Sequence, residues 1–100
     1  MHTRIEIDKT LLAKYFIETY VNYQFDHGRE KNIESRILSA DIPVDAKEIL
    51  LWRFYERLFI KQIGVRLQKK LNLVEPLSDR QVSRRLNKAC ELFFPIFLNT

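Results

Sequence analysis

Along the last quarter of the chain, apolar residues recur every three or four positions and predict a helix that starts at Ser78. Ser78 can accept a hydrogen bond from a free amide of the first turn, Gln81 is spaced as its reciprocal partner, and Pro76 excludes helix upstream. The apolar positions are Val82, Leu86, Ala89, Cys90 and Phe93, and the opposite side carries Arg80, Ser83, Arg84, Asn87 and Lys88. The pattern therefore predicts a helix that buries one side and exposes a basic one.

Two earlier helices are predicted between Pro43 and Leu73 by the same periodicity. The first begins at Asp45, a candidate cap with Glu48 as the capping-box residue, and the second spans about residues 59–73. Their inward positions are Leu50, Leu51, Phe54 and Leu58 in the first helix and Ile60, Ile63, Leu67 and Leu71 in the second, with Trp52 and Tyr55 at the margins. A glycine in a helix interior costs about 1 kcal/mol relative to alanine. We therefore expect another helix to cross closely at Gly64.

The amino-terminal part of the chain predicts two more helices, from Asp8 to about Phe25 and from about Glu30 to Ala40. The residues expected to face the core are Leu12, Phe16, Tyr20 and Tyr23 in the first and Ile33, Ile37 and Leu38 in the second. Gly28 suits the left-handed position that follows a helix. Residues 1–7 alternate weakly and predict a short extended arm. We expect these two helices to cover the ones that follow.

The apolar stretch at the end of the chain allows two interpretations. In the first, Phe93 closes the core, Pro95 ends the helix, and residues 96–98 fold back over the amino-terminal helix. In the second, the stretch makes a hydrophobic contact with a second subunit, as in a homodimer, or with a larger parent chain.

Length and composition are typical of one all-α domain. With 100 residues the chain can bury one modest core, and with only two glycines and three prolines it has few positions that interrupt helices. The expected architecture is a compact bundle of about five helices. Residues 1–42 form a helical cover, residues 43–94 a core that contains a helix-turn-helix, and residues 95–100 an apolar tail.

Positive charge is concentrated in one part of the chain. Residues 53–88 hold ten Lys and Arg against three Asp and Glu, whereas residues 1–52 hold seven against nine. A localised basic region of this size is typical of a surface that binds a polyanion. The alternative is that these side chains only solubilise the outer faces of helices. Their coincidence with the predicted helix pair favours nucleic acid.

Little in the sequence points to catalysis or to a membrane. His2 and His27 have no spaced acidic or cysteine partner, and Cys90 falls on the apolar side of its helix. We expect no catalytic residue, no metal site and no cofactor, so an enzyme is not predicted. A single cysteine cannot form an internal disulfide, which favours a reducing cytoplasm. No apolar run approaches the roughly 18 residues of a membrane span.

Two stretches resemble region four of bacterial sigma factors, most closely the extracytoplasmic-function group. They are KEILLWRFYERLFIKQIGVRL and SDRQVSRRLNKACELF, and the resemblance covers about residues 45–93. The residues that carry it are Trp52, Arg53, Glu56, Arg57, Leu58, Ile63, Gly64, Gln81, Val82, Ser83, Arg84, Arg85, Leu86 and Ala89. Arg57 stands where the family has a turn glycine, and Phe59 stands where it has a capping hydroxyl.

The connection between Gly64 and Ser78 is about eight residues longer than the family pattern. The extra residues lie within 68–77. They either extend the second helix by two turns, which would bring Lys69 and Lys70 to the phosphate backbone, or form a wing-like loop.

The resemblance implies a helix-turn-helix whose last helix enters the major groove of double-stranded DNA. The expected base-reading residues are Arg80, Ser83, Arg84 and Asn87, and the expected phosphate contacts are Arg66, Lys69, Lys70, Arg85 and Lys88. The chain would then be a DNA-binding transcription regulator or the carboxy-terminal domain of a sigma-like factor. The alternative function is a protein-interaction module that docks on RNA polymerase or on another transcription regulator.

An aromatic row lies on the first predicted helix. Its members are Tyr15, Phe16, Tyr20, Tyr23 and Phe25. Sigma factors use aromatic side chains of another region to trap flipped promoter bases, but the row lacks the basic residues that such a surface needs. Spacing of three to four residues on a helix is typical of a core, and we interpret the row as core.

Overall fold

A long carboxy-terminal helix, α5 (Asp79–Leu98), is the element on which three of the other helices pack in the computed structural model, which describes residues 9–99. The other elements are α1 (Lys9–Asp26), α2 (Lys31–Ser39), α3 (Val44–Leu50), its continuation as a single π-helical turn η1 (Leu51–Tyr55), and α4 (Ile60–Leu71). No strand occurs within residues 9–99. The predicted all-α bundle of about five helices is confirmed.

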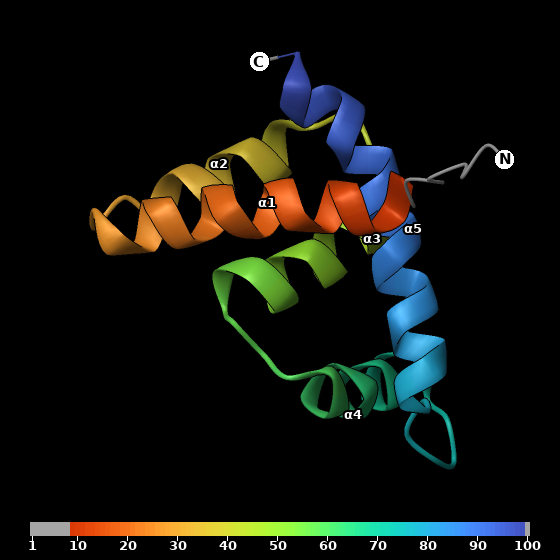
Figure 1. Ribbon diagram of the computed structural model, residues 1–100. Coiled ribbons are helices and arrows are strands. Elements are labelled where there is room, and N and C mark those ends of the chain that lie inside the picture. Colours follow the sequence, from red (N-terminus) through yellow and green to blue (C-terminus); the bar gives the residue numbers. More distant parts are fainter. Residues whose placement is uncertain (1–8, 100) are drawn as a thin grey trace, which may run out of the picture.

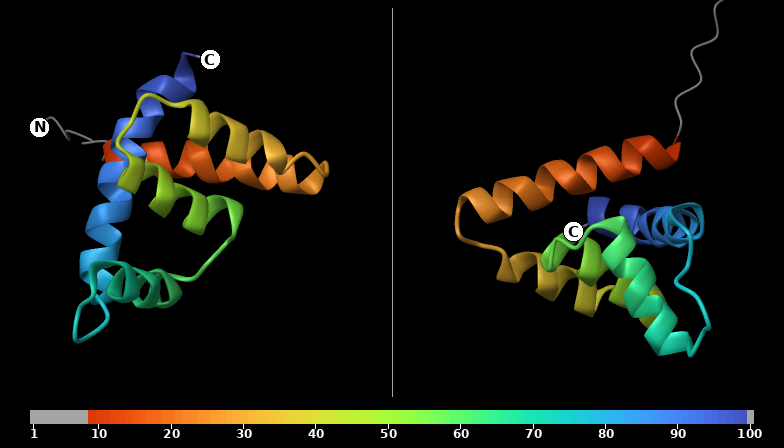
Figure 2. Two further views of the ribbon diagram at one scale, coloured as in Figure 1. Left: turned by 180° about the vertical axis from the view of Figure 1, so that it is seen from behind. Right: turned by 90° about the horizontal axis from the view of Figure 1, so that it is seen from below.

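Figure 1 shows how the helices are arranged around α5. Helix α1 crosses the middle of α5, α2 lies beside α1, and α3 lies beneath both. Helix α4 packs near the amino-terminal end of α5, and Figure 2 shows the two crossing at a steep angle when α5 is seen end-on. The first half of α5 therefore projects away from the layer formed by α1 and α2.

One contiguous core joins all five helices. Leu50, Ile63, Val82 and Cys90 are completely buried, and they come from α3, α4 and α5. Burial of an apolar side chain of this size contributes about 1.5–3 kcal/mol, so these contacts fix α4 and α5 on α3. The core positions predicted in the last helix are confirmed, since Val82, Leu86, Ala89, Cys90 and Phe93 are all buried.

The predicted core face of α1 is wrong. The buried positions are Ala13, Ile17, Val21 and Gln24, whereas Leu12, Tyr15, Phe16 and Tyr23 are exposed and only Tyr20 of the expected stripe packs against the core. Apolar residues surround most of this helix, and the side with small or branched residues is the one that allows close packing on neighbouring helices. The aromatic row is therefore largely surface. Leu38 of α2 and Leu71 of α4 are likewise exposed rather than inward.

Helix ends follow local chemistry in some places and depart from it in others. After α1, Gly28 adopts φ 65°, Arg29 N donates to Gln24 O at 2.7 Å and Gly28 N to Phe25 O at 3.1 Å, which satisfies the last carbonyls as predicted. Asp45 is not the cap of α3. Pro43 holds the cap position, and its carbonyl accepts a hydrogen bond from Lys47 N at 3.1 Å, so the cap lies two residues earlier than predicted. The Asp8 cap and the arm over residues 1–7 lie outside the described residues.

Pro95 does not end the last helix, which continues through it to Leu98. A proline inside a helix loses one backbone hydrogen bond and crowds the preceding turn. Contacts beyond it offset that cost, because the Phe97 ring lies 5.1 Å from the ring of Tyr20 and the guanidinium of Arg36 donates to the Phe97 carbonyl at 2.9 Å. The tail thus covers α1 and α2 as a helical extension.

The long connection between α4 and α5 combines both predicted forms. Helix α4 continues to Leu71, and Asn72 ends it in the left-handed conformation with φ 54°. Residues 73–78 then form a loop that leads to α5. The close approach expected at Gly64 exists, and it involves both this loop and the crossing helix α5, whose Val82 Cγ2 would lie 3.4 Å from a Cβ atom on Gly64. A Cβ atom on Gly64 would lie 2.8 Å from the carbonyl oxygen of Leu77.

The turn before α4 has a left-handed residue where the sigma-factor pattern has glycine. Arg57 adopts φ 58°, which is unfavourable for a residue with a side chain. The Arg57 guanidinium lies 4.5 Å from the ring centre of Phe25 and donates to Asn22 Oδ1 at 3.3 Å. These contacts tie the turn to α1 and offset the backbone strain.

Phe59 cannot cap α4, because its side chain has no hydrogen-bonding atom. Only the second bond of a capping box forms, in which Phe59 N donates to Gln62 Oε1 at 2.7 Å.

Candidate nucleic-acid interface

The start of α5 is fixed by the predicted capping box. Gln81 N donates to Ser78 Oγ at 3.2 Å, and Ser78 N donates to Gln81 Oε1 at 2.9 Å. Each bond satisfies an amide that would otherwise lack a partner at the helix end. Because these bonds hold the Gln81 side chain back against the cap, the outward surface of α5 is left mainly to the cationic residues.

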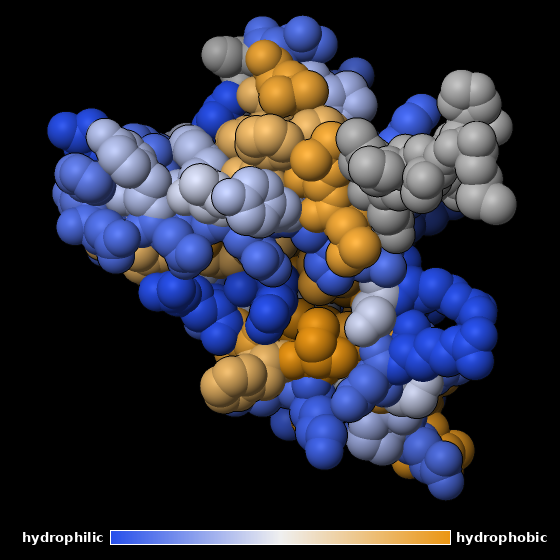
Figure 3. Space-filling view, viewed as in Figure 1, coloured by the Kyte–Doolittle hydropathy of each residue, from blue (hydrophilic) through white to orange (hydrophobic). Residues whose placement is uncertain are grey.

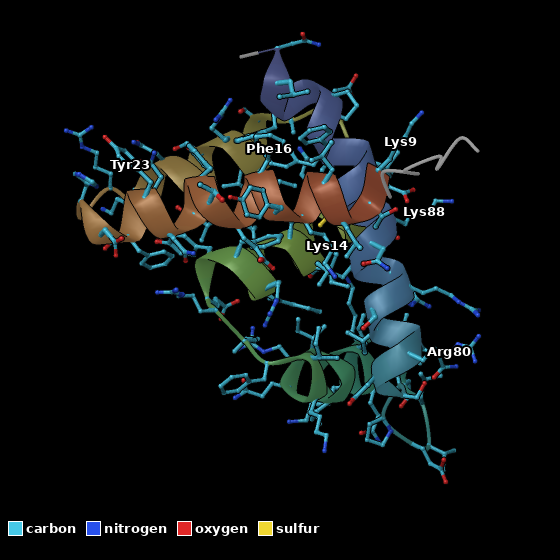
Figure 4. The ribbon with its side chains drawn as sticks, in the orientation of Figure 1. Lys9, Lys14, Phe16, Tyr23, Arg80 and Lys88 are labelled. Carbon is cyan, nitrogen blue, oxygen red and sulfur yellow. The ribbon has the colours of Figure 1, made fainter. Side chains whose placement is uncertain are left out.

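Three cations form a strip along the outer side of α5. Arg80, Arg84 and Lys88 are spaced by four residues, so they share one side of the helix, and all three are exposed. None of the three forms an ion pair within residues 9–99. Figure 4 shows Arg80 and Lys88 pointing away from the bundle in the same direction. The strip is about 12 Å long at 1.5 Å per residue.

The other two predicted base-reading residues lie on the flank of this strip. Ser83 and Asn87 are half-buried, and the side-chain oxygen of Asn87 is buried without a hydrogen-bond partner within the described residues. Arg80 and Arg84 are therefore better placed than Ser83 and Asn87 to reach base edges in an undistorted duplex.

The predicted phosphate contacts fall into two groups. Arg66 Nη1 lies 2.9 and 3.0 Å from the two carboxylate oxygens of Glu56, and Lys70 is paired with Glu48. Lys69, Arg85 and Lys88 are exposed and form no ion pair within residues 9–99. Exposed pairs stabilise a fold by about 0–1 kcal/mol, so Arg66 and Lys70 can exchange a carboxylate for a phosphate at small cost.

Two features of the surface were not predicted from the sequence. The first is Lys14 of α1, which lines a recess together with Arg84, Asn87 and Lys88. The second is an apolar groove of about 270 Å³ between α3, α4 and α5, which includes Ala46, Ile49, Trp52 and Leu67 in its lining. Each joins helices that are distant in the sequence, so periodicity within one helix carries no signal for it.

Cys90 is a core residue, as its position in the sequence indicated. Its side chain is completely buried, and removal from solvent raises the pKa of the thiol to about 12. At pH 8 only about one thiol in ten thousand would then be the reactive thiolate. We therefore expect iodoacetamide to leave Cys90 unmodified in the folded protein and to modify it after denaturation, as measured by mass spectrometry. Rapid modification without denaturant would show that this part of α5 opens.

No group of His, Cys, Asp and Glu within residues 9–99 is arranged to hold a metal ion. Over the same residues, no helix combines the length and the apolar character needed to cross a bilayer. Comparison of the chain with protein-family models, with curated proteins and with solved structures gives no match. The resemblance to region four of sigma factors rests on the residues quoted above.

Proposed function

We propose that this chain binds double-stranded DNA through the first three turns of α5, as a cytoplasmic transcription regulator or as the DNA-binding part of a sigma-like factor. The observation that carries the proposal is the exposed strip of Arg80, Arg84 and Lys88 on the projecting half of α5. Arginine can donate two hydrogen bonds to a guanine edge, and a helix with one basic side fits the major groove. Arg85 lies beside this strip on α5, and it would contact phosphates together with Lys69 of α4.

Binding of a labelled duplex of random sequence over a series of salt concentrations tests the proposal. A protein that neutralises several phosphates releases counterions, so the logarithm of its affinity falls linearly with the logarithm of salt concentration. We expect such a line, and we expect selection from a random pool to enrich one sequence. If no duplex binds even at low salt, the DNA-binding function is excluded.

Replacement of Lys69 by alanine should weaken binding to every duplex by a similar factor. Loss of one phosphate contact is expected to lower the salt slope by about one without changing sequence preference. The Lys70→Ala variant is the matched comparison, and its effect should be smaller because Lys70 is already paired with Glu48. A change in sequence preference on Lys69→Ala would instead place this residue near base edges.

The second candidate function is a module that docks on RNA polymerase or on another transcription regulator. The observation in its favour is the apolar surface that Figure 3 shows where α1 meets the end of α5. Leu12 and Phe16 of α1 and Leu98 of α5 are exposed, and Phe94 is half-buried. The rings of Phe16 and Phe94 are stacked with centres 6.0 Å apart. Exposed apolar clusters of this kind are typical of protein contacts. This function becomes the leading one if duplex binding fails.

A further inference from the structure

The first turn of α1 is fastened to the second half of α5. Thr10 Oγ1 donates to Glu91 Oε1 at 2.5 Å, and Ala13 and Ile17 are buried one and two turns further along α1. This contact places the start of α1 at the point where the exposed strip of α5 ends, next to Lys88. Side chains from the amino-terminal helix can therefore extend the basic surface of α5.

A recess of about 340 Å³ lies at this junction and gathers positive charge from both helices. Lys14 enters it from α1, and Arg84, Asn87, Lys88 and Glu91 line it from α5. The three cations form no ion pair within residues 9–99, and the only carboxylate of the recess accepts the hydrogen bond from Thr10. Three cations against the one carboxylate of Glu91 leave a net positive charge in the recess, which a bound anion would offset.

Position and chemistry together indicate which anion fits. Arg84 and Lys88 belong both to the recess and to the strip that faces outward on α5. The ammonium groups of Lys14 and Lys88 match the oxygens of a phosphodiester, and the Arg84 guanidinium beside them can donate to a base edge. When α5 lies in a groove, a backbone phosphate runs along the flank of the helix, which is where the recess opens.

We propose that Lys14 and Lys88 hold a backbone phosphate of duplex DNA at the edge of the groove that α5 enters, beside the base edge that Arg84 faces. The inference rests on the proposed function and adds a DNA contact from the amino-terminal helix. Helix α1 then has a second task besides covering the core, because it limits how far α5 can insert and fixes the register of the duplex along it.

Duplex binding by the Lys14→Gln variant over a salt series tests this contact, with Lys31→Gln as the matched control. Lys31 is exposed on α2 and loses the same charge. We expect Lys14→Gln to weaken binding about threefold to tenfold near 0.1 M salt and to lower the salt slope by about one. Lys31→Gln should leave the slope unchanged, and Lys14→Arg should retain affinity.

Methylation of lysines in the unaltered protein gives a second measurement that does not depend on a variant folding. Duplex DNA should protect Lys14 from modification and leave Lys31 reactive, whereas inorganic phosphate at the same ionic strength should protect neither. Equal protection of Lys14 by phosphate alone would indicate a site for a free anion and overturn the backbone contact. Suppose that the unaltered protein binds duplex, that Lys14 stays reactive in the complex, and that Lys14→Gln keeps the salt slope of the unaltered protein. This inference then fails and the proposed function stands. If the unaltered protein binds no duplex, both fail.

Discussion

Simultaneous replacement of Arg80 and Arg84 by alanine is expected to abolish recognition of a selected DNA sequence while leaving the fold intact. Each arginine that contacts a base edge contributes about 1–3 kcal/mol of discrimination. The loss of both should therefore weaken binding to the selected site about thirtyfold or more, and binding to random duplex considerably less. Both side chains are exposed, so the melting temperature should hardly change. Fluorescence anisotropy on the two duplexes and thermal unfolding by circular dichroism measure these quantities.

A variant with the same loss of charge separates base reading from general electrostatic attraction. Arg29→Ala combined with Lys31→Ala removes two exposed cations near the α1 to α2 turn, away from α5. We expect this control to bind both duplexes nearly as well as the unaltered protein. An equal loss for the selected and the random duplex in the Arg80 and Arg84 variant would assign both arginines to phosphates, and α5 would not be the reading helix.

The parts of the fold that the sequence predicted depend on chemistry between near neighbours. The start of α5 follows from Ser78 and Gln81, which lie three residues apart and satisfy each other's backbone amides. The end of α1 follows from Gly28 for a similar reason. In contrast, the buried side of α1 depends on which of its apolar sides meets α5, and that choice is made by packing between distant helices.

The same distinction applies to the candidate site. Helical periodicity alone places Arg80, Arg84 and Lys88 on one side of α5, so this strip was predictable. The pair of Arg66 with Glu56 joins α4 to the turn after η1, and the pair of Lys70 with Glu48 joins α4 to α3, so neither carried a local signal. The turn at Arg57 is similar, since its left-handed backbone is compensated by Phe25 and Asn22 of α1.

Gly64 lies where α4 packs against the loop before α5, and Gly64→Ala is expected to destabilise the protein. In an isolated helix, alanine would be favoured over glycine by about 1 kcal/mol. Here the new Cβ atom would lie 2.8 Å from the carbonyl oxygen of Leu77 and 3.4 Å from Val82 Cγ2. The backbone at Leu77 cannot move without pulling on the capped start of α5, and such crowding costs about 1–3 kcal/mol.

We therefore expect Gly64→Ala to lower the free energy of unfolding by up to about 2 kcal/mol, which for a domain of this size lowers the melting temperature by up to about 16 °C. The matched control is Val65→Ala, because Val65 is the next residue of α4 and is 41% exposed. That variant should be neutral or slightly more stable, since alanine is the better helix former. A Gly64→Ala protein as stable as its control would mean that the backbone of the loop before α5 moves away from the new Cβ atom at little cost. The orientation of α5 on α4 would then not be set by this contact, because only a rigid connection transmits the crowding at Gly64 to α5.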